Sequence, residues 1–585
     1  MPTHNPIEER CESILCALRF HVRNRGEQVA YTFLKSDDER QTLTYRQLDE
    51  RARGIAQELL QHAIPGDRAL MAYPAGLEFI AAFLGCLYAG IVAVPAYPPK
   101  KNRNADRVLA IADDCQPKLI LCTTETSGNV LGDFANAVLG SIVLATDTLG
   151  CMHGGMSHLG FPEIQPGHLA LLQYTSGSTA VAKGVMVTHG NIVANELLIQ
   201  RYFEFSHSSV MVSWLPMFHD MGLIGGILAP LFVGFHSIVM APNTFLTEPV
   251  KWLSAVTEFK GTTTGAPNFA YDLCVRRITA DQRKSLDLSS LRIAYNGAEP
   301  VRAETLEQFS QAFAECGFRA EACFPCYGMA ETTLLVSGGP PLKATTVVSV
   351  DPLALEQHRL VETPGGQRIV SCGQVGPDME VRVVDPETGV ECWSDRIGEL
   401  WVSGDSVAQG YLHRSDETRA AFQAKLMLDE RNWLRTGDYG FLRDGELFVT
   451  GRLKDLLIIR GRNIYPQDIE QLAEQHLCFL EPNACAAFSV DCNGEEKMVV
   501  VAEGTRPMVR WRRDLEVLNG AACALNDSID KLRSAAVKQF EVALADLVFL
   551  RPGSFPRTSS GKVQRGQCRA LYLNGTADIV FVTAQ

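Results

Sequence analysis

A loop rich in glycine, serine and threonine follows a short apolar run and could bind phosphate groups. The run spans residues 169–172, and the loop reads Tyr174-Thr-Ser-Gly-Ser-Thr-Ala-Val-Ala-Lys-Gly184. Glycines let backbone N–H groups approach an anion, hydroxyls add donors, and the lysine adds positive charge. It is not a Gly-x-x-x-x-Gly-Lys-Ser/Thr motif, because Gly184 follows Lys183 and the hydroxyls precede the lysine. These residues suit a polyphosphate, although a solvated linker explains the segment alone equally well.

Four further segments decide between these interpretations. They are Tyr327-Gly-Met-Ala-Glu-Thr-Thr333, Thr436-Gly-Asp438, Gly451-Arg-Leu-Lys-Asp455 and Pro556-Arg-Thr-Ser-Ser-Gly-Lys562. Together with the phosphate loop, in this order, they closely resemble the adenylate-forming superfamily of acyl-CoA synthetases, peptide-synthetase adenylation domains and luciferases. The resemblance runs from about residue 42 to residue 565. It implies an enzyme that joins a carboxylic acid to AMP and releases pyrophosphate.

The resemblance also implies a nucleotide site. The phosphate loop surrounds the β- and γ-phosphates, the Tyr327 ring and the backbone of residues 296–300 enclose adenine, and an aspartate with an arginine holds the ribose. The implied residues are Thr175, Ser176, Gly177, Ser178, Thr179, Lys183, Gly297, Ala298, Glu299, Tyr327, Gly328, Met329, Ala330, Thr332, Asp438 and Arg452. Taken alone, Asp438 is equally well explained as a turn residue.

A metal ion and a catalytic lysine follow from the same resemblance. Glu331, with Thr175, is expected to hold the Mg²⁺ that bridges phosphate oxygens, since magnesium usually takes only a few protein oxygens. A charge at a helix N-terminus is the alternative for Glu331. Lys562 would by itself be a mobile surface charge. In the family, the matching lysine swings in with a small domain and contacts the carboxylate and phosphate oxygens, and Lys454 lies near the hinge.

An apolar segment at residues 213–225 points to the acid that is activated. Together with residues 265–272 it would line a tunnel for an alkyl chain, although core packing is the plainer explanation. The expected lining residues are Trp214, Phe218, Asp220, Met221, Gly222, Ile224 and Phe269. His219 and Asp220 are adjacent, so an acid–base pair is a poor interpretation. We expect His219 to gate or orient the carboxylate.

The segments at residues 213–225 and 265–272 strongly resemble those of the fatty acyl-AMP ligases, which pass the acyl group to an acyl carrier protein. An extra stretch at about residues 340–372 matches an insertion of that branch, which restrains the movement that exposes a coenzyme A site; a neutral surface loop is the alternative.

Ala182 departs from the family, which usually has proline at this position, so the phosphate loop loses some stiffness. A long-chain fatty acid–CoA ligase and a catalytically silent adenylate-binding protein remain alternatives. Asp527 and Ser528 resemble a carrier attachment site but are expected to flank a helix.

Composition limits the function further. A net charge of −13 argues against broad nucleic-acid binding. The 17 cysteines indicate reduced thiols, and the pair Cys323 and Cys326 has no second pair to complete a zinc site. Residues 1–10 carry no signal-peptide pattern, so we expect a cytoplasmic protein, and residues 222–235 are too few to cross a bilayer.

Periodicity predicts an α/β protein of several domains. Helices are expected at residues 44–61 and 78–88, alternating with strands at 119–122 and 141–145. Short strands from about residue 371 indicate a distorted β-barrel, and a turn is expected at residues 461–463. These patterns place a boundary at residues 453–454, with two α/β subdomains to about 370 and the barrel at 371–453. The family resemblance implies that residues 1–453 form the adenylation domain and that residues 454–585 form a small, mobile α+β domain, which carries Lys562.

Overall fold

The computed structural model describes most of the chain. The described residues are 11–36, 39–97, 105–127, 140–150, 160–174, 182–427, 429–459, 462–477, 479–492, 495–511, 515–540, 542–558 and 561–584. Among them, no helix is long and apolar enough to cross a membrane. The apolar segment at 222–235 is instead buried, as a π-helix (Met221–Leu228) followed by α8 (Ala229–Val233).

The first sheet is parallel except at one edge. Its strand order is β6-β5-β3-β4-β7-β8, and β7 pairs antiparallel with β8, with Tyr174 opposite Gly184. The predicted helices are present, and the first begins with a capping box between Thr44 and Gln47. The bounds are α1 (Ile14–Arg25), α2 (Tyr45–His62), β3 (Arg68–Ala72), α3 (Leu77–Ala89), β4 (Val92–Ala96), α4 (Ala105–Cys115), β5 (Leu119–Cys122), α5 (Thr124–Thr126), β6 (Ile142–Ala145), β7 (Leu169–Tyr174) and β8 (Gly184–Thr188).

The second sheet combines segments far apart in the chain. Its order is β13-β12-β11-β9-β10-β1-β2, so the two N-terminal strands join a sheet whose other strands begin after residue 209. The bounds are β1 (Val29–Leu34), β2 (Arg40–Thr44), α7 (His189–Tyr202), β9 (Val210–Ser213), β10 (His236–Met240), α9 (Pro242–Thr247), α10 (Val250–Phe259), β11 (Thr263–Ala266), α11 (Asn268–Arg277), α12 (Ala280–Arg283), β12 (Ile293–Asn296), α13 (Ala303–Phe313) and β13 (Cys323–Pro325).

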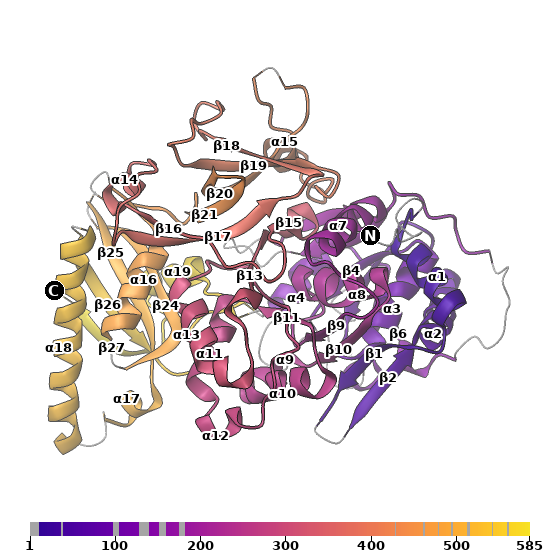
Figure 1. Ribbon diagram of the computed structural model, residues 1–585, viewed down its shortest axis with the longest axis horizontal. Helices are drawn as coiled ribbons and strands as arrows, with labels where there is room; N and C mark the ends of the chain where they lie inside the picture. Colours follow the sequence, from indigo (N-terminus) through magenta and orange to yellow (C-terminus); the bar gives the residue numbers. More distant parts are fainter. Residues whose placement is uncertain are drawn as a thin grey trace.

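A third, antiparallel sheet contains the β-rich part expected after residue 370. Its order is β14-β15-β17-β21-β20-β19-β18, and β16 also pairs with β17. Figure 1 shows it above the α/β layers. The bounds are β14 (Tyr327–Gly328), β15 (Leu335–Gly338), β16 (Val347–Val350), α14 (Pro352–Glu356), β17 (Gln367–Val375), β18 (Met379–Val384), β19 (Gly398–Gly404), α15 (Ser415–Phe422), β20 (Leu434–Arg443) and β21 (Glu446–Arg452).

The small C-terminal domain lies at the end of the molecule opposite α1 to α3 (Figure 1). Alternate residues of β24 face α16 and α18 on one side of its sheet and α19 on the other. The bounds are β22 (Leu457–Ile459), β23 (Arg462–Ile464), α16 (Pro466–His476), β24 (Leu480–Cys492), β25 (Glu495–Gly504), α17 (Arg506–Trp511), α18 (Leu515–Phe540), β26 (Leu544–Leu550), α19 (Arg565–Leu573) and β27 (Ile579–Ala584).

Two local predictions in this domain were wrong. Arg462 and Asn463 were expected in a turn, but they pair with β22 as a strand. Asp527 and Ser528 were expected to flank a helix, but they lie inside α18, where the Ser528 hydroxyl donates to the Leu525 carbonyl at 2.7 Å. Tertiary pairing and helix continuation outweigh the turn preference of Asn, Asp and Ser.

Candidate active site

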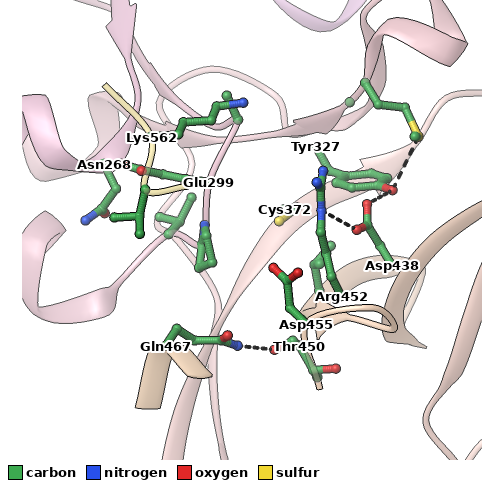
Figure 2. Close-up of a pocket in the computed structure, with 18 of the residues that line it drawn as sticks. Asn268, Glu299, Tyr327, Cys372, Asp438, Thr450, Arg452, Asp455, Gln467 and Lys562 are labelled. Carbon is green, nitrogen blue, oxygen red and sulfur yellow. Dashed lines mark hydrogen bonds and ion pairs between the residues drawn. The ribbon is translucent and has the colours of Figure 1, made fainter. Parts of the chain in front are cut away.

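One large cavity, with a volume of about 1300 Å³, brings most of the predicted residues together. Its walls come from both α/β sheets, the antiparallel sheet and the small domain. Figure 2 shows Lys562 beside Asn268 and Glu299, facing Tyr327, Asp438 and Arg452 across the cavity. Residues separated by more than 200 positions therefore meet in one place.

The expected ribose-binding residues form a hydrogen-bonded group. Neighbouring strands place Asp438 opposite Arg452 in the β20–β21 register. The Asp438 carboxylate accepts from the Tyr327 hydroxyl at 2.7 Å and from the Arg452 Nε at 3.1 Å (Figure 2). Burial and the neighbouring Asp438 charge raise the pKa of Tyr327, so its phenol stays protonated as the donor. The buried carboxylate is thus an anchored acceptor at the cavity wall.

The expected adenine wall is only partly at the cavity. Ala298, Glu299 and the residues 327–331 line it, whereas Gly297 and Thr332 are not among the lining residues. Gly297 lies against Cys326, where a Cβ would come within 2.9 Å of the carbonyl oxygen. Thr332 is fully buried, and its hydroxyl donates to the Met329 carbonyl at 2.9 Å. These two residues shape the wall from behind.

Lys562 lies at the tip of a tight loop of the small domain. The Lys562 N–H donates to the Thr558 hydroxyl at 3.0 Å, and the Thr558 N–H donates to the Lys562 carbonyl at 2.8 Å. Gly561 has φ of +90° and sits against the Phe269 ring, 2.9 Å from the place of a Cβ. Burial lowers the pKa of Lys562, while Asp220 and Glu299 oppose this effect. The loop geometry therefore directs a cation into the cavity.

His219 and Asp220 also line the cavity. Burial, with the charges of Lys562 and Arg107, lowers the pKa of His219 to about 3. The imidazole is therefore neutral near pH 7 and adds no charge. The Asp220 carboxylate accepts from the Met221 N–H at 2.7 Å at the start of the π-helix, and burial raises its pKa. This pair can therefore orient a ligand.

Glu331 is held by a tyrosine that the sequence analysis did not single out. The Tyr411 hydroxyl donates to Glu331 Oε1 at 2.9 Å, and the Glu331 carbonyl accepts from the Ala408 N–H at 2.9 Å. Burial raises the pKa of Glu331. Among the described residues, no cluster of three or more His, Cys, Asp or Glu side chains could hold a metal alone. A single carboxylate fits Mg²⁺ that is shared with a polyphosphate.

The phosphate loop is described only at its ends. Thr175, Ser176, Gly177, Ser178 and Thr179 lie outside the described residues. Lys183, at the far end, lines the cavity and forms an ion pair with Glu417 on α15. Lys454, the expected hinge residue, is the second residue after β21 and also lines the cavity.

The apolar part of the cavity differs from the expected tunnel. Asp220, Met221 and Phe269 line it, but Trp214, Phe218, Gly222 and Ile224 do not. Trp214 instead stacks on Phe245 with ring centroids 4.0 Å apart, and so belongs to the core. The apolar lining that the sequence analysis missed comes from α7 and the residues that follow it, from β9 and β12 of the second sheet, and from β15 of the antiparallel sheet: Ile199, Phe203, Phe205, Met211, Tyr295 and Leu335. No motif in the sequence marks these residues.

The insertion at about residues 340–372 contacts the small domain directly. The Arg462 guanidinium donates to both Glu356 carboxylate oxygens at 2.8 and 3.0 Å, and Asn463 Nδ2 donates to the Glu356 carbonyl at 2.9 Å. The buried Tyr465 ring lies in one apolar cluster with Leu355 of α14. The insertion is therefore packed against β23 and its neighbours, and is not an isolated surface loop.

Comparison with known proteins identifies the family of the chain. Residues 18–412 match the family model of the AMP-binding enzymes. The chain is 38% identical to the crystal structure of fatty acid AMP ligase from Legionella pneumophila, with a TM-score of 0.76 over 100% of this chain and 99% of that one. It is also 34% identical to the long-chain-fatty-acid–AMP ligase FadD32 of Mycolicibacterium smegmatis, over 98% of each chain.

The chain belongs to the fatty acyl-AMP ligases. Another relative is the medium-chain-fatty-acid–[acyl-carrier-protein] ligase JamA of Moorena producens, 40% identical over 97% of this chain and 96% of its own. The expected adenylate-forming fold, with a large N-terminal domain and a small C-terminal one, is confirmed. The enzyme is thus an ATP-using acid–AMP ligase.

Proposed function

We propose that this enzyme activates a medium- or long-chain fatty acid with ATP and Mg²⁺ to acyl-AMP and then passes the acyl group to an acyl carrier protein. The main support is the single cavity that joins the group at Asp438, the Lys562 loop and an apolar lining. Few other activities need a buried ribose acceptor, an inserted cation and an alkyl-binding wall together.

The nucleotide is held at the Asp438 end of the cavity. Asp438 accepts from the ribose hydroxyls, and Arg452 keeps the carboxylate oriented through their 3.1 Å hydrogen bond. Adenine lies against the Tyr327 ring, with Ala298 and Glu299 on the opposite wall. Because the Tyr327 hydroxyl is already tied to Asp438, adenine and ribose are positioned by one connected group.

The reaction itself needs charge neutralisation and alignment. The fatty acid carboxylate and the triphosphate are both negative, so their approach requires cations. Lys562 donates to the carboxylate and the α-phosphate oxygens, where negative charge gathers in the transition state. One carboxylate oxygen forms the new bond to the α-phosphorus, and pyrophosphate leaves with the electron pair of the broken P–O bond. No proton is removed, so the neutral His219 only orients the carboxylate.

Glu331 would hold Mg²⁺ through a carboxylate oxygen, with Thr175 as the expected second ligand, and Tyr411 fixes the direction of that carboxylate. Once bound, Mg²⁺ would supply positive charge to the phosphate oxygens.

The acyl chain follows the apolar lining. The apolar lining includes Phe269, Met221, Phe203, Phe205 and Met211. These side chains carry no charge, so they favour an alkyl chain over a polar acid.

The most specific part of the proposal is the identity of the acyl acceptor. The contacts of Glu356 with Arg462 and Asn463 hold the small domain in the arrangement that places Lys562 in the cavity. A restrained small domain favours retention of acyl-AMP over thioester formation with free coenzyme A. JamA, which is described as a ligase for an acyl carrier protein, supports the same acceptor.

Acid-dependent exchange of pyrophosphate into ATP tests the proposal. Fatty acids of increasing length are compared with short polar acids, in the presence of Mg²⁺ and after its removal with EDTA. We expect exchange only with Mg²⁺ and with medium or long acids. Absence of exchange with every acid would favour the silent adenylate-binding protein.

A further inference from the structure

The segment at residues 409–412 lies along β8, immediately after the phosphate loop. The Leu412 N–H donates to the Gly184 carbonyl at 2.9 Å, and the Gln409 N–H donates to the Met186 carbonyl at 2.9 Å. Tyr411 therefore forms a bridge opposite Val185. This backbone pairing fixes Tyr411 close to the end of the loop.

Arg414 ties the segment to both ends of the phosphate loop. Its Nη2 donates to the Ala182 carbonyl at 3.2 Å and to Asp114 Oδ1 at 3.4 Å. The Tyr174 hydroxyl, on the other end of the loop, donates to Asp114 Oδ2 at 2.6 Å. A single arginine and aspartate thus connect the residues before and after the loop.

Lys183 also contacts the segment at residues 409–417. Its ammonium pairs with the Glu417 carboxylate and lies 5.1 Å from the centre of the Tyr411 ring. The Tyr411 hydroxyl in turn donates to Glu331. One tyrosine therefore contacts both the lysine of the phosphate loop and the expected magnesium ligand.

The partners of Lys183 suggest an anchoring role. An ion pair that is partly open to solvent contributes little by itself. Lys183 is more enclosed, however, because its side chain is 23% exposed and a cation–π contact adds to the pair. Glu417 also accepts from Arg414 Nη1 at 3.2 Å, so its carboxylate is held in place. The hydrogen bond from Lys183 and the other cationic partners lower the pKa of Glu417.

We propose that Glu417 is a positioning residue: it holds Lys183 against Tyr411, so that Lys183 anchors the end of the phosphate loop to α15 and contacts protein instead of phosphate. This inference rests on the proposed ATP-dependent activation. It gives Lys183 a role different from the phosphate contact that the family resemblance implies. Other groups then neutralise the phosphates.

Charge reversal separates the two roles of Lys183. The dissociation constant of ATP with Mg²⁺ is measured by titration calorimetry, without fatty acid, for Lys183→Glu, Glu417→Lys and the double variant. We expect each single variant to bind ATP about tenfold or more weakly, because misplacement of a binding group is costly. The double variant restores the ion pair but not the hydrogen bond from Arg414 to residue 417, so it should bind ATP more tightly than either single variant.

Asp416→Asn is the matched control, since Asp416 is the neighbouring acid with a side chain 92% exposed, and it should bind ATP as the wild type does. If Lys183 contacts phosphate, Glu417→Lys adds a cation and does not weaken ATP binding, and the double variant stays as poor as Lys183→Glu. That result overturns the inference. If a reversal fails to fold, Glu417→Gln decides alone, because anchoring predicts weaker ATP binding and phosphate contact predicts unchanged or tighter binding. Failure of acid activation would appear only in pyrophosphate exchange, so the two failures are distinguishable.

Discussion

At the scale of single residues, Lys562 is the proposed donor to the transition state. It is the cation that the small domain inserts into the cavity, with Asp220 and Glu299 among the nearby anions. Lys562→Ala should lower the rate of acyl-AMP formation by about 10²–10³, as removal of one transition-state donor does in other enzymes. ATP affinity should stay within a few-fold, because Asp438, Tyr327 and Arg452 are unchanged. Near-normal pyrophosphate exchange by this variant would refute the role of Lys562.

Motifs predicted the polar residues of the site better than patterning predicted the apolar ones. Lys562, Glu331, Asp438 and Arg452 were named from the sequence, and all line one cavity. Trp214 was expected there as well, but it packs on Phe245. A polar motif can be recognised by its spacing, whereas the direction of an apolar side chain depends on neighbours from other elements. Tyr411 was missed because nothing in its local pattern connects it with Glu331.

At the scale of elements, the loop that carries Lys562 depends on one glycine. Gly561→Ala introduces a Cβ 2.9 Å from the Phe269 ring at a φ of +90°. Gly553→Ala is the matched control, because Gly553 has a φ of +84° and no atom within 4 Å of the added Cβ. Both variants carry similar backbone strain, of about 1–3 kcal/mol. We expect kcat for exchange to fall at least about tenfold in Gly561→Ala only. Equal kcat values for the two variants would contradict a role for the contact between Gly561 and the Phe269 ring.

Asp468, near the start of α16, should make the stability of the folded protein depend on pH. Gln367 Nε2 donates to Asp468 Oδ1 at 2.9 Å across the interface between β17 and the small domain. Burial, with repulsion from Glu470 and Glu356, raises the pKa of Asp468 to about 7, although Arg302 and the Gln367 hydrogen bond oppose the shift. An ordinary aspartate in the unfolded chain ionises near pH 4. The contribution of Asp468 to the free energy of unfolding is therefore fully present below about pH 4 and is lost as the pH rises to about 7.

Asp468→Asn keeps the acceptor for Gln367 but cannot ionise. The Tm of this variant relative to the wild type should therefore rise between pH 4 and about pH 7 and stay constant above. Thermal melting across this range measures the difference. A pH-independent difference in Tm would contradict a raised pKa at this interface.

The regular elements were largely predictable, whereas their assembly was not. The helix expected at residues 44–61 is α2, and the strand at 119–122 is β5, because hydrophobic periodicity is a local property. The joining of β1 and β2 to the second sheet depends on pairing with β10 and has no local signal. The strand at Arg462–Ile464 was mistaken for a turn for the same reason, since its pairing with β22 stabilises it.

At the scale of the whole molecule, the insertion and the small domain act as one unit. Glu356, Arg462, Asn463 and Tyr465 connect them through hydrogen bonds and an apolar cluster. In the proposed function, this connection keeps Lys562 in the cavity and opposes the rotation that a second, thioester-forming step would need. The proposed acceptor therefore rests on the arrangement of domains and not on any single residue.

The most direct test is a mass-spectrometric time course of the products from ATP, Mg²⁺, a medium- or long-chain fatty acid and coenzyme A. We expect acyl-AMP and pyrophosphate to accumulate, with no more acyl-CoA than in a reaction without enzyme. Addition of a phosphopantetheinylated acyl carrier protein should then consume the acyl-AMP. Rapid formation of acyl-CoA would contradict the account and identify a fatty acid–CoA ligase.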